Sequence, residues 1–307
     1  MSAENLNRLA REFRLALDAQ LAGDERSEIR LPSREAVAAI CRHYLEILFP
    51  VYFAAPGAER ATLDRRTGAY LREMQTLLAD QICRAMRFDC RSKGKPAPAD
   101  AAHYVEEVLG SLFEEFAELA GLLGSDLEAA YQNDPAASSY EAILLSYPYV
   151  EAITVQRLAH RLYLLDVPFV PRMMTEVAHN HTGIDINPGA SIGESFFIDH
   201  GTGVVIGETA TIGKKVTLYH GVTLGAFNPT LRDESGTLRR GRENKRHPDL
   251  EGHVTVYPGA TILGGQTVIG HHSIIGGNVW LTHSVAPYSK VTMKEPELVI
   301  RSDRPKE

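Results

Sequence analysis

The sequence predicts an α+β protein in which an α-helical N-terminal domain precedes a parallel β-solenoid of hexapeptide repeats. Three observations support this fold. Apolar residues first recur every three or four positions, the composition then changes sharply near Gly183, and aliphatic residues afterwards recur every six positions from Ile186 to Val285. Each hexapeptide is expected to form one short strand and one corner, so that three make a coil of about eighteen residues around an aliphatic core.

The first predicted domain covers residues 1–183 and is helical. Segments 68–88 and 101–123 carry apolar residues at the spacing that gathers them on one face of a helix. A further helix is expected over residues 139–163, with a kink or boundary at Pro148 because proline lacks an amide donor. A domain of this kind can cover one open end of a solenoid.

The second predicted domain is the solenoid, residues 184–288. Its period is interrupted by two extra residues before Ile206 and by an insert at residues 227–246, and it slips by one residue before Ile269. The insert carries six basic and three acidic residues, so it is expected to loop out from a corner rather than continue the core. Residues 289–307 are predicted to form a charged C-terminal tail. The inward positions are Ile186, Ile192, Ile198, Ile206, Ile212, Leu218, Leu224, Leu250, Val256, Ile262, Ile269, Ile275 and Leu281.

The overall composition excludes several classes of protein. A net charge of −7 over 307 residues disfavours a general nucleic-acid binder. The charged N-terminus lacks a signal-peptide core, and no stretch approaches the ~20 apolar residues that span a bilayer. Cys41, Cys83 and Cys90 are odd in number and lack the spacing of metal ligands. These features predict a cytoplasmic protein that binds neither nucleic acid nor membrane.

Two histidine motifs lie within the solenoid, although a solenoid does not require them. They are D-H-G-T-G at 199–203 and R-H-P at 246–248. Four further segments accompany them: N-D-P-A at 133–136, V-E-A-I-T-V-Q-R-L-A-H at 150–160, D-I-N-P-G-A-S-I-G at 185–193 and V-T-L-G-A at 222–226. In this order the motifs resemble those of serine O-acetyltransferases. The resemblance implies a left-handed parallel β-helix that transfers acetyl from acetyl-CoA, without a metal, to the L-serine hydroxyl in the first step of cysteine biosynthesis.

The reaction requires a base that removes the hydroxyl proton as the oxygen attacks the thioester. Histidine suits this task at neutral pH, and His200 is the predicted general base. The resemblance implies that Asp185 is the carboxylate that orients His200. It also implies that His247 lies beside the hydroxyl, where it polarises that group or assists the tetrahedral intermediate.

Serine also carries a carboxylate and an ammonium group. The planar guanidinium of Arg246 is suited to hold the carboxylate. Asp134 and Asp199 match the family positions that hold the ammonium group. Two carboxylates favour the protonated amine, which is not a nucleophile, so transfer would be directed to oxygen.

Contacts to coenzyme A follow from the resemblance alone. The family lays the pantetheine arm between neighbouring coils, which implies contacts at Gly225 and Ala226. The basic insert is expected either to meet the phosphates or to be a solvated loop. The segment G-V-P-A-R that is common after the last coil is replaced by V-T-M-K-E-P-E-L, which removes expected contacts to the cofactor.

The resemblance also implies a homo-oligomer, either a trimer or a hexamer made as a dimer of trimers, with the active site between neighbouring subunits. The family's partner enzyme, O-acetylserine sulfhydrylase, grips a C-terminal isoleucine. This sequence ends R-P-K-E, so that complex is not expected.

Other interpretations stay open at this stage. The acceptor could be a sugar or another hydroxy amino acid, and the chain could be a regulatory scaffold without activity. His220 follows His200 by one coil, so with His247 these imidazoles could form a zinc site like that of solenoid carbonic anhydrases. Asp134 could simply be a helix N-cap before Pro135.

Overall fold

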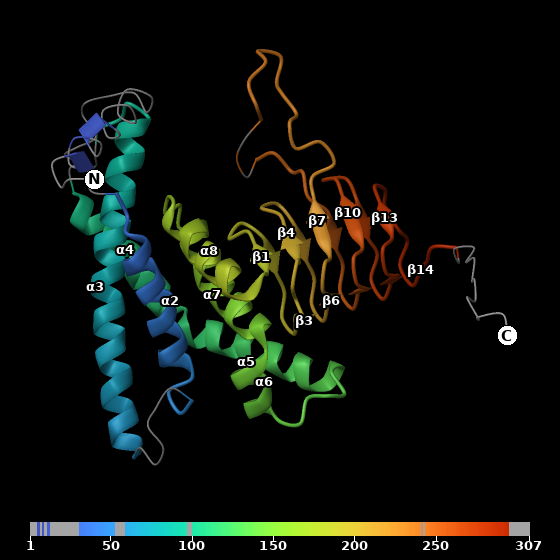
Figure 1. Cartoon of the computed structure of the whole chain (residues 1–307), viewed down its shortest axis with the longest axis horizontal. Helices are drawn as coiled ribbons and strands as arrows, with labels where there is room; N and C mark the ends of the chain where they lie inside the picture. Colours follow the sequence, from blue (N-terminus) through green and yellow to red (C-terminus); the bar gives the residue numbers. More distant parts are fainter. Residues whose placement is uncertain are drawn as a thin grey trace.

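The computed structural model describes residues 31–52, 59–96, 100–239, 241 and 243–294, with Asn5, Leu6, Arg8, Arg11 and Glu12 near the N-terminus. Arg240, Arg242 and the tail after residue 294 lie outside the described residues. Helices fill one end of the molecule, and short parallel strands are stacked at the other (Figure 1). The predicted fold, a helical region followed by a parallel β-solenoid, is confirmed. Within the described ranges, each helix is too short or too polar to cross a membrane.

Between Arg34 and Thr182 the described residues form the main helical region. Its helices are α2 (Arg34–Leu48), α3 (Arg60–Ser92), α4 (Ala101–Glu114), α5 (Phe116–Asn133), α6 (Tyr140–Ser146), α7 (Pro148–Leu164) and α8 (Val170–Thr182).

Local chemistry explains several of these boundaries. The side chain of Ser139 accepts a hydrogen bond from the amide of Ala142 at 3.2 Å and caps α6. Pro148 is the first residue of α7. Its lack of an amide proton has no cost there, because the first amide of a helix has no partner within the helix. Gly183 ends α8 in the left-handed conformation, with φ of 71°. The helix predicted over 101–123 is instead divided at Glu115 into α4 and α5.

The strands form three parallel sheets, called here A, B and C. Sheet A has the order β1-β4-β7-β10-β13, sheet B has β11-β8-β5-β2 and sheet C has β14-β12-β9-β6-β3. The strands are β1 (Asp185–Ile186), β2 (Ser191–Ile192), β3 (Phe197–Asp199), β4 (Val205–Ile206), β5 (Thr211–Ile212), β6 (Thr217–Tyr219), β7 (Thr223–Gly225), β8 (Asp249–Leu250), β9 (Thr255–Val256), β10 (Thr261–Leu263), β11 (Val268–Ile269), β12 (Ile274–Ile275), β13 (Trp280–Leu281) and β14 (Lys290–Val291).

Each coil therefore passes through sheets A, B and C in turn. The C–A corner is defined here as the turn from a strand of sheet C to the next strand of sheet A. The A–B corner is defined in the same way. Strand β14 pairs with β12, so the solenoid extends past residue 288, where the tail was predicted to begin.

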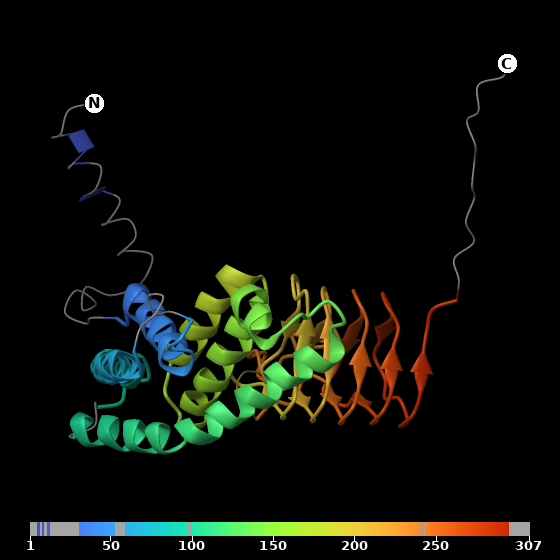
Figure 2. The same cartoon turned by 90° about the horizontal axis from the view of Figure 1, so that it is seen from below.

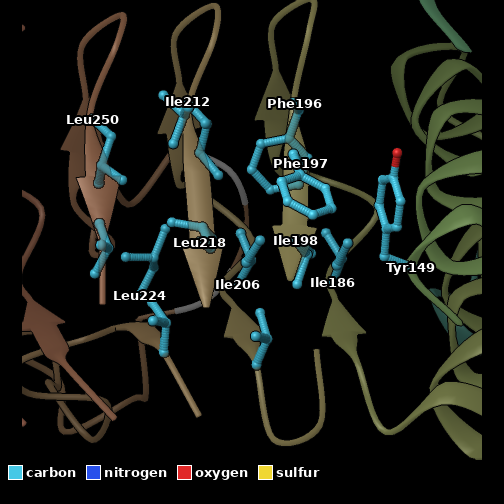
Figure 3. Packing of buried hydrophobic residues seen from close by; sticks show 14 of the residues in the cluster. Tyr149, Ile186, Phe196, Phe197, Ile198, Ile206, Ile212, Leu218, Leu224 and Leu250 are labelled. Carbon is cyan, nitrogen blue, oxygen red and sulfur yellow. The ribbon is translucent and has the colours of Figure 1, made fainter. Parts of the chain in front are cut away.

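The core of the solenoid is a continuous column of aliphatic side chains. Ile186, Ile206 and Leu224 lie one above another in sheet A and are each at most 2% exposed. Figure 3 shows this column with Tyr149 of α7 beside it. The ring of Tyr149 meets that of Phe197 edge to face at 5.2 Å, so the helices and the first coil share one core.

Helix α7 covers the open edge of sheet B. Strand β2 is the terminal strand there, so its outward backbone groups lack a neighbouring strand. Gln156 donates to the carbonyl of Ala190 at 2.9 Å, and Arg157 donates to those of Ile192 and Gly193 at 3.1 and 2.9 Å. Side chains of the 150–160 motif thus replace the missing coil.

Arg157 also forms a buried ion pair that joins two helices. Its Nε lies 2.7 Å from Oδ2 of Asp126 on α5, and the two side chains are 4% and 1% exposed. Asp126 accepts in addition from the amide of Phe196 at 2.9 Å. Figure 2 shows α5 alongside the first coils, where this pair fixes the helix to the solenoid.

Candidate active site

His200 lies at the C–A corner of the first coil, where the six-residue period is interrupted. Strand β3 ends at Asp199 and β4 begins at Val205, whereas β6 ends at Tyr219 and β7 begins at Thr223. The first coil therefore has the two extra residues at this corner. The interruption seen in the sequence therefore lies at the corner that begins with His200.

Backbone geometry at this corner exposes the imidazole. His200 and Gly201 have φ of 60° and 86°, and a Cβ atom on Gly201 would lie 2.4 Å from Cδ1 of Ile184, so only glycine fits there. The side chain of His200 is 72% exposed, with Nδ1 3.6 Å from Oδ1 of Asp199. Its ring lies 5.7 Å from that of His220, so the expected column of two histidines is present.

A pocket of about 350 Å³ opens beside His200. Its walls come from the end of α5, the junction of α6 and α7, and strand β3. The pocket brings together three predicted site residues, Asp134, Asp199 and His200. Asp134 ends α5, and its Oδ1 accepts from the amide of Ala136 at 2.8 Å. Asp134 is thus not a helix N-cap, because Ser139 caps α6.

Tyr147 is a pocket residue that sequence reasoning missed as a functional candidate. Its hydroxyl donates to Oδ2 of Asp134. This bond, burial and the charges of Asp134 and Asp199 together raise the pKa of Tyr147 to about 12. The only sequence signal was its place before Pro148, which predicts a boundary and not a contact across the pocket.

Asp185 has a different partner from the one predicted. Its Oδ1 accepts from Arg172 of α8 at 2.8 Å, and Arg172 also pairs with Glu176. Among the described residues, Asp185 and His200 do not form an ion pair. Nothing in the sequence identified Arg172, because its contact joins a helix to a strand thirteen residues later.

Arg246 and His247 lie at the A–B corner, where the insert returns to the solenoid. The guanidinium of Arg246 pairs with Glu208, and the Arg246 amide donates to Oγ1 of Thr209 at 2.9 Å. The imidazole Nδ1 of His247 accepts from the amide of Thr209 at 3.0 Å. The sequence motifs gave no role to Glu208 or Thr209.

His247 is a neutral hydrogen-bond donor at this corner. Its side chain is largely enclosed, and the residue is 8% exposed. Burial lowers the pKa of His247 to about 4, and the charge of Arg246 acts in the same direction. Because Nδ1 accepts from Thr209, the ring proton is on Nε2. A Cβ atom on Gly207 would lie 2.0 Å from Cδ2 of His247, so this glycine leaves room for the ring.

The two corners lie at opposite ends of the strands of sheet A. In Figure 1 the insert that ends at Arg246 projects on the other side of the molecule from α5 and α6, which form the pocket beside His200. One chain therefore divides the predicted site residues between two groups. It brings Asp134, Asp199 and His200 together but does not join them to Arg246 and His247. For the same reason, His247 is not a third imidazole beside His200 and His220 of the same chain.

Gly225 and Ala226 are half-buried at the A–B corner, where the insert leaves the solenoid. The amide of Gly264 donates to the carbonyl of Gly225 at 3.0 Å. A Cβ atom on Gly225 would lie 2.8 Å from Cδ2 of Leu263. Within the insert, Arg232 and Leu238 pair antiparallel, so this part of the loop turns back on itself like a hairpin.

The chain is similar to several known proteins. The "Serine acetyltransferase, plasmid" of Synechococcus elongatus is 46% identical over 275 residues, which are 89% of this chain and 84% of that protein. The crystal structure of Entamoeba histolytica serine acetyltransferase 1 in complex with L-cysteine aligns with a TM-score of 0.71 at 34% identity, covering 83% of this chain and 86% of that one. The Neisseria gonorrhoeae serine acetyltransferase in complex with serine aligns with a TM-score of 0.54 at 25% identity, covering 84% and 97%. No family model matches the chain.

Proposed function

We propose that this chain, which belongs to the serine acetyltransferase family, transfers acetyl from acetyl-CoA to the L-serine hydroxyl and releases O-acetylserine and CoA. The observation that carries this proposal is the pocket in which an exposed histidine faces two aspartates. A hydroxylated amino acid matches that pocket, because it offers a hydroxyl to the base and an ammonium group to the carboxylates. Such a reaction begins cysteine biosynthesis.

His200 acts as the general base in this proposal. It removes the proton of the serine hydroxyl as the oxygen attacks the thioester carbonyl, and the C–S bond of the tetrahedral intermediate then breaks to release CoA. We assign Asp185 to orienting the imidazole. This assignment requires His200 to turn away from Asp199, which its 72% exposed side chain permits.

Asp134 and Asp199 hold the ammonium group of serine. A protonated amine has no lone pair for attack, so these carboxylates direct acetyl transfer to oxygen. Their charges already act together on Tyr147, whose pKa both of them raise. This shared effect supports their placement around one cation.

A complete site would need two copies of the chain. Arg246, which we assign to the serine carboxylate, lies at the A–B corner with His247, away from His200. We infer that the A–B corner of one protomer meets the C–A corner of its partner in a trimer or a dimer of trimers. His247 would then present its Nε2 proton to the oxygen that becomes negative during attack.

Mixing two inactive variants tests this arrangement. His200→Ala and His247→Ala chains are expressed together, so that some interfaces combine an intact His200 with an intact His247 from the partner. Random pairing should restore about a quarter of wild-type activity per site. A mixture no more active than its components would show that each site uses a single chain.

Acetyl-CoA is proposed to bind at the start of the insert, near Gly225 and Ala226, where backbone groups border the A–B corner. Basic residues of the insert would then lie near its phosphates. We place the protein in the cytoplasm, because Cys41, Cys83 and Cys90 are unpaired thiols.

The decisive experiment is acetyl-CoA consumption by the purified protein with serine, homoserine, threonine and a panel of sugars. The proposal predicts the highest kcat/KM with L-serine. A preference for a sugar would instead support the broader acyltransferase class. Consumption no faster than buffer with every acceptor would support a scaffold without activity.

A further inference from the structure

The hydroxyl of Tyr147 lies between the end of α5 and the strand that carries Asp199. It donates to Oδ2 of Asp134, and the charges of both Asp134 and Asp199 act on it. All three residues line the pocket beside His200. Tyr147 therefore contacts one carboxylate of the pocket and lies in the electric field of both. The sequence motifs gave it no role.

The backbone of Tyr147 is held firmly at the junction of two helices. Its amide donates to the carbonyl of Ile143 at 3.0 Å, and its carbonyl accepts from the amide of Val150 at 3.1 Å. It is the last residue associated with α6 and directly precedes Pro148, the first residue of α7. Because the backbone of Tyr147 is fixed on both sides, its side chain can hold the carboxylate of Asp134 in one position.

Asp134 receives one donor on each carboxylate oxygen. The amide of Ala136 donates to Oδ1 at 2.8 Å, and Tyr147 donates to Oδ2. The two bonds fix the plane of the carboxylate, and each oxygen keeps a further lone pair for a ligand. A tyrosine hydroxyl is protonated at physiological pH even at its ordinary pKa of about 10, so Tyr147 acts on Asp134 as a donor.

We propose that Tyr147 is a positioning residue for ammonium recognition, whose hydroxyl holds Asp134 in the orientation that accepts the amino group of the acceptor. Tyr147 thereby makes the pocket select amino acids over hydroxy acids. The proposal rests on the proposed function, because it assumes that an acceptor ammonium group binds in this pocket.

Tyr147→Phe removes the hydroxyl and keeps the ring. Steady-state kinetics would compare L-serine with 3-hydroxypropanoate, which is serine without its amino group. We expect kcat/KM for L-serine to fall about tenfold, the effect of one hydrogen bond to a charged group. The fall should appear mainly in KM. The kcat/KM for 3-hydroxypropanoate and the KM for acetyl-CoA should change less than twofold.

Tyr140→Phe is the matched control. Tyr140 lies on α6 and donates to Glu128 on the exposed surface, so the same kind of bond is removed outside the pocket. This variant should keep the wild-type preference for L-serine. Calorimetric titration of each variant with L-serine alone would measure binding independently of turnover, and only Tyr147→Phe should bind more weakly.

Three results would overturn the inference. Equal loss with both acceptors would show that Tyr147 only supports the fold, and unchanged kinetics would show that Asp134 does not need it. An equal effect of Tyr140→Phe would point to a general effect of α6. These outcomes differ from failure of the proposed function, in which the wild-type protein itself would not acetylate L-serine.

Discussion

The two histidine corners of the solenoid differ in almost every physical respect. At the C–A corner, the side chain of His200 is 72% exposed and its near neighbours include a carboxylate, Asp199. At the A–B corner, His247 is 8% exposed and its near neighbours include a guanidinium. An exposed imidazole beside a carboxylate can accept a proton, whereas a buried imidazole beside a cation stays neutral and donates. The same residue type thus has two chemistries, and position in the coil decides which.

Both corners coincide with an interruption of the hexapeptide period. Two extra residues at the C–A corner present His200, and the long insert at the A–B corner ends at Arg246. The regular C–A corner of the next coil also carries an exposed histidine, His220, but His220 is not among the residues that line the pocket beside His200. In this solenoid, the repeat supplies a rigid wall and the interruptions carry the proposed chemistry.

Removing the base at the exposed corner should have the largest effect. His200→Ala is expected to lower kcat by ~10²–10⁴, the usual contribution of a positioned acid–base group. Acetyl-CoA turnover measures kcat, and calorimetry should still detect L-serine binding. Near-wild-type turnover in this variant would contradict the contrast drawn between the two corners.

Substitution of His247 at the A–B corner should lower kcat by less than substitution of His200. His247→Asn keeps an acceptor for Thr209 but removes the Nε2 donor, so kcat should fall by about 10². The rate profile between pH 6 and pH 9 should keep its shape, because the pKa of His247 is already about 4. A changed midpoint in the profile would contradict a His247 that stays neutral over this range.

Much of the fold could be predicted from the sequence because its determinants are periodic. Ile206 and Leu224 are eighteen residues apart, Ile186 and Ile206 are twenty apart because of the two extra residues, and all three lie in one column. The break at Glu115 was not predictable, because α4 and α5 both carry helical apolar spacing up to that residue. The motif containing Gln156 and Arg157 was recognised, but its role in covering β2 depends on packing between domains.

The candidate site was predictable only in part. Asp134, Asp199 and His200 were identified from motifs and share a pocket. Tyr147 and Arg172 were not identified, because their partners become neighbours only after helices pack on the first coil. Counting strands could have assigned His200 and His247 to different corners, since one follows a strand of sheet C and the other precedes a strand of sheet B.

Replacing the guanidinium of Arg246 with an ammonium group should have a moderate effect on the binding of L-serine. Arg246→Lys keeps the charge but loses the planar pair of donors, so the KM for L-serine should rise about tenfold with a smaller fall in kcat. Initial rates across serine concentrations would measure both constants. Arg232→Lys makes the same change at an exposed arginine of the insert and should leave the KM for L-serine within about twofold. An unchanged KM in Arg246→Lys would argue against a role in carboxylate binding.

The smallest expected effect is on stability, and it follows from the buried imidazole. The ordinary pKa of histidine is about 6.5, and burial lowers that of His247 to about 4. Between these values the unfolded chain takes up a proton that the folded chain does not. The contribution of this residue to the free energy of unfolding is therefore complete above about pH 6.5, declines as the pH falls, and is lost below about pH 4.

Thermal unfolding at pH 7.5 and pH 5.5 would test this difference between the corners. The wild-type midpoint should fall by more on acidification than that of His247→Asn, because the variant has no imidazole to desolvate. His103→Asn removes an exposed histidine on α4 and should follow the wild type. Since other groups titrate equally in all three proteins, the difference between variants isolates His247. If His247→Asn and wild type lose the same number of degrees, the imidazole at the A–B corner is not held neutral by burial.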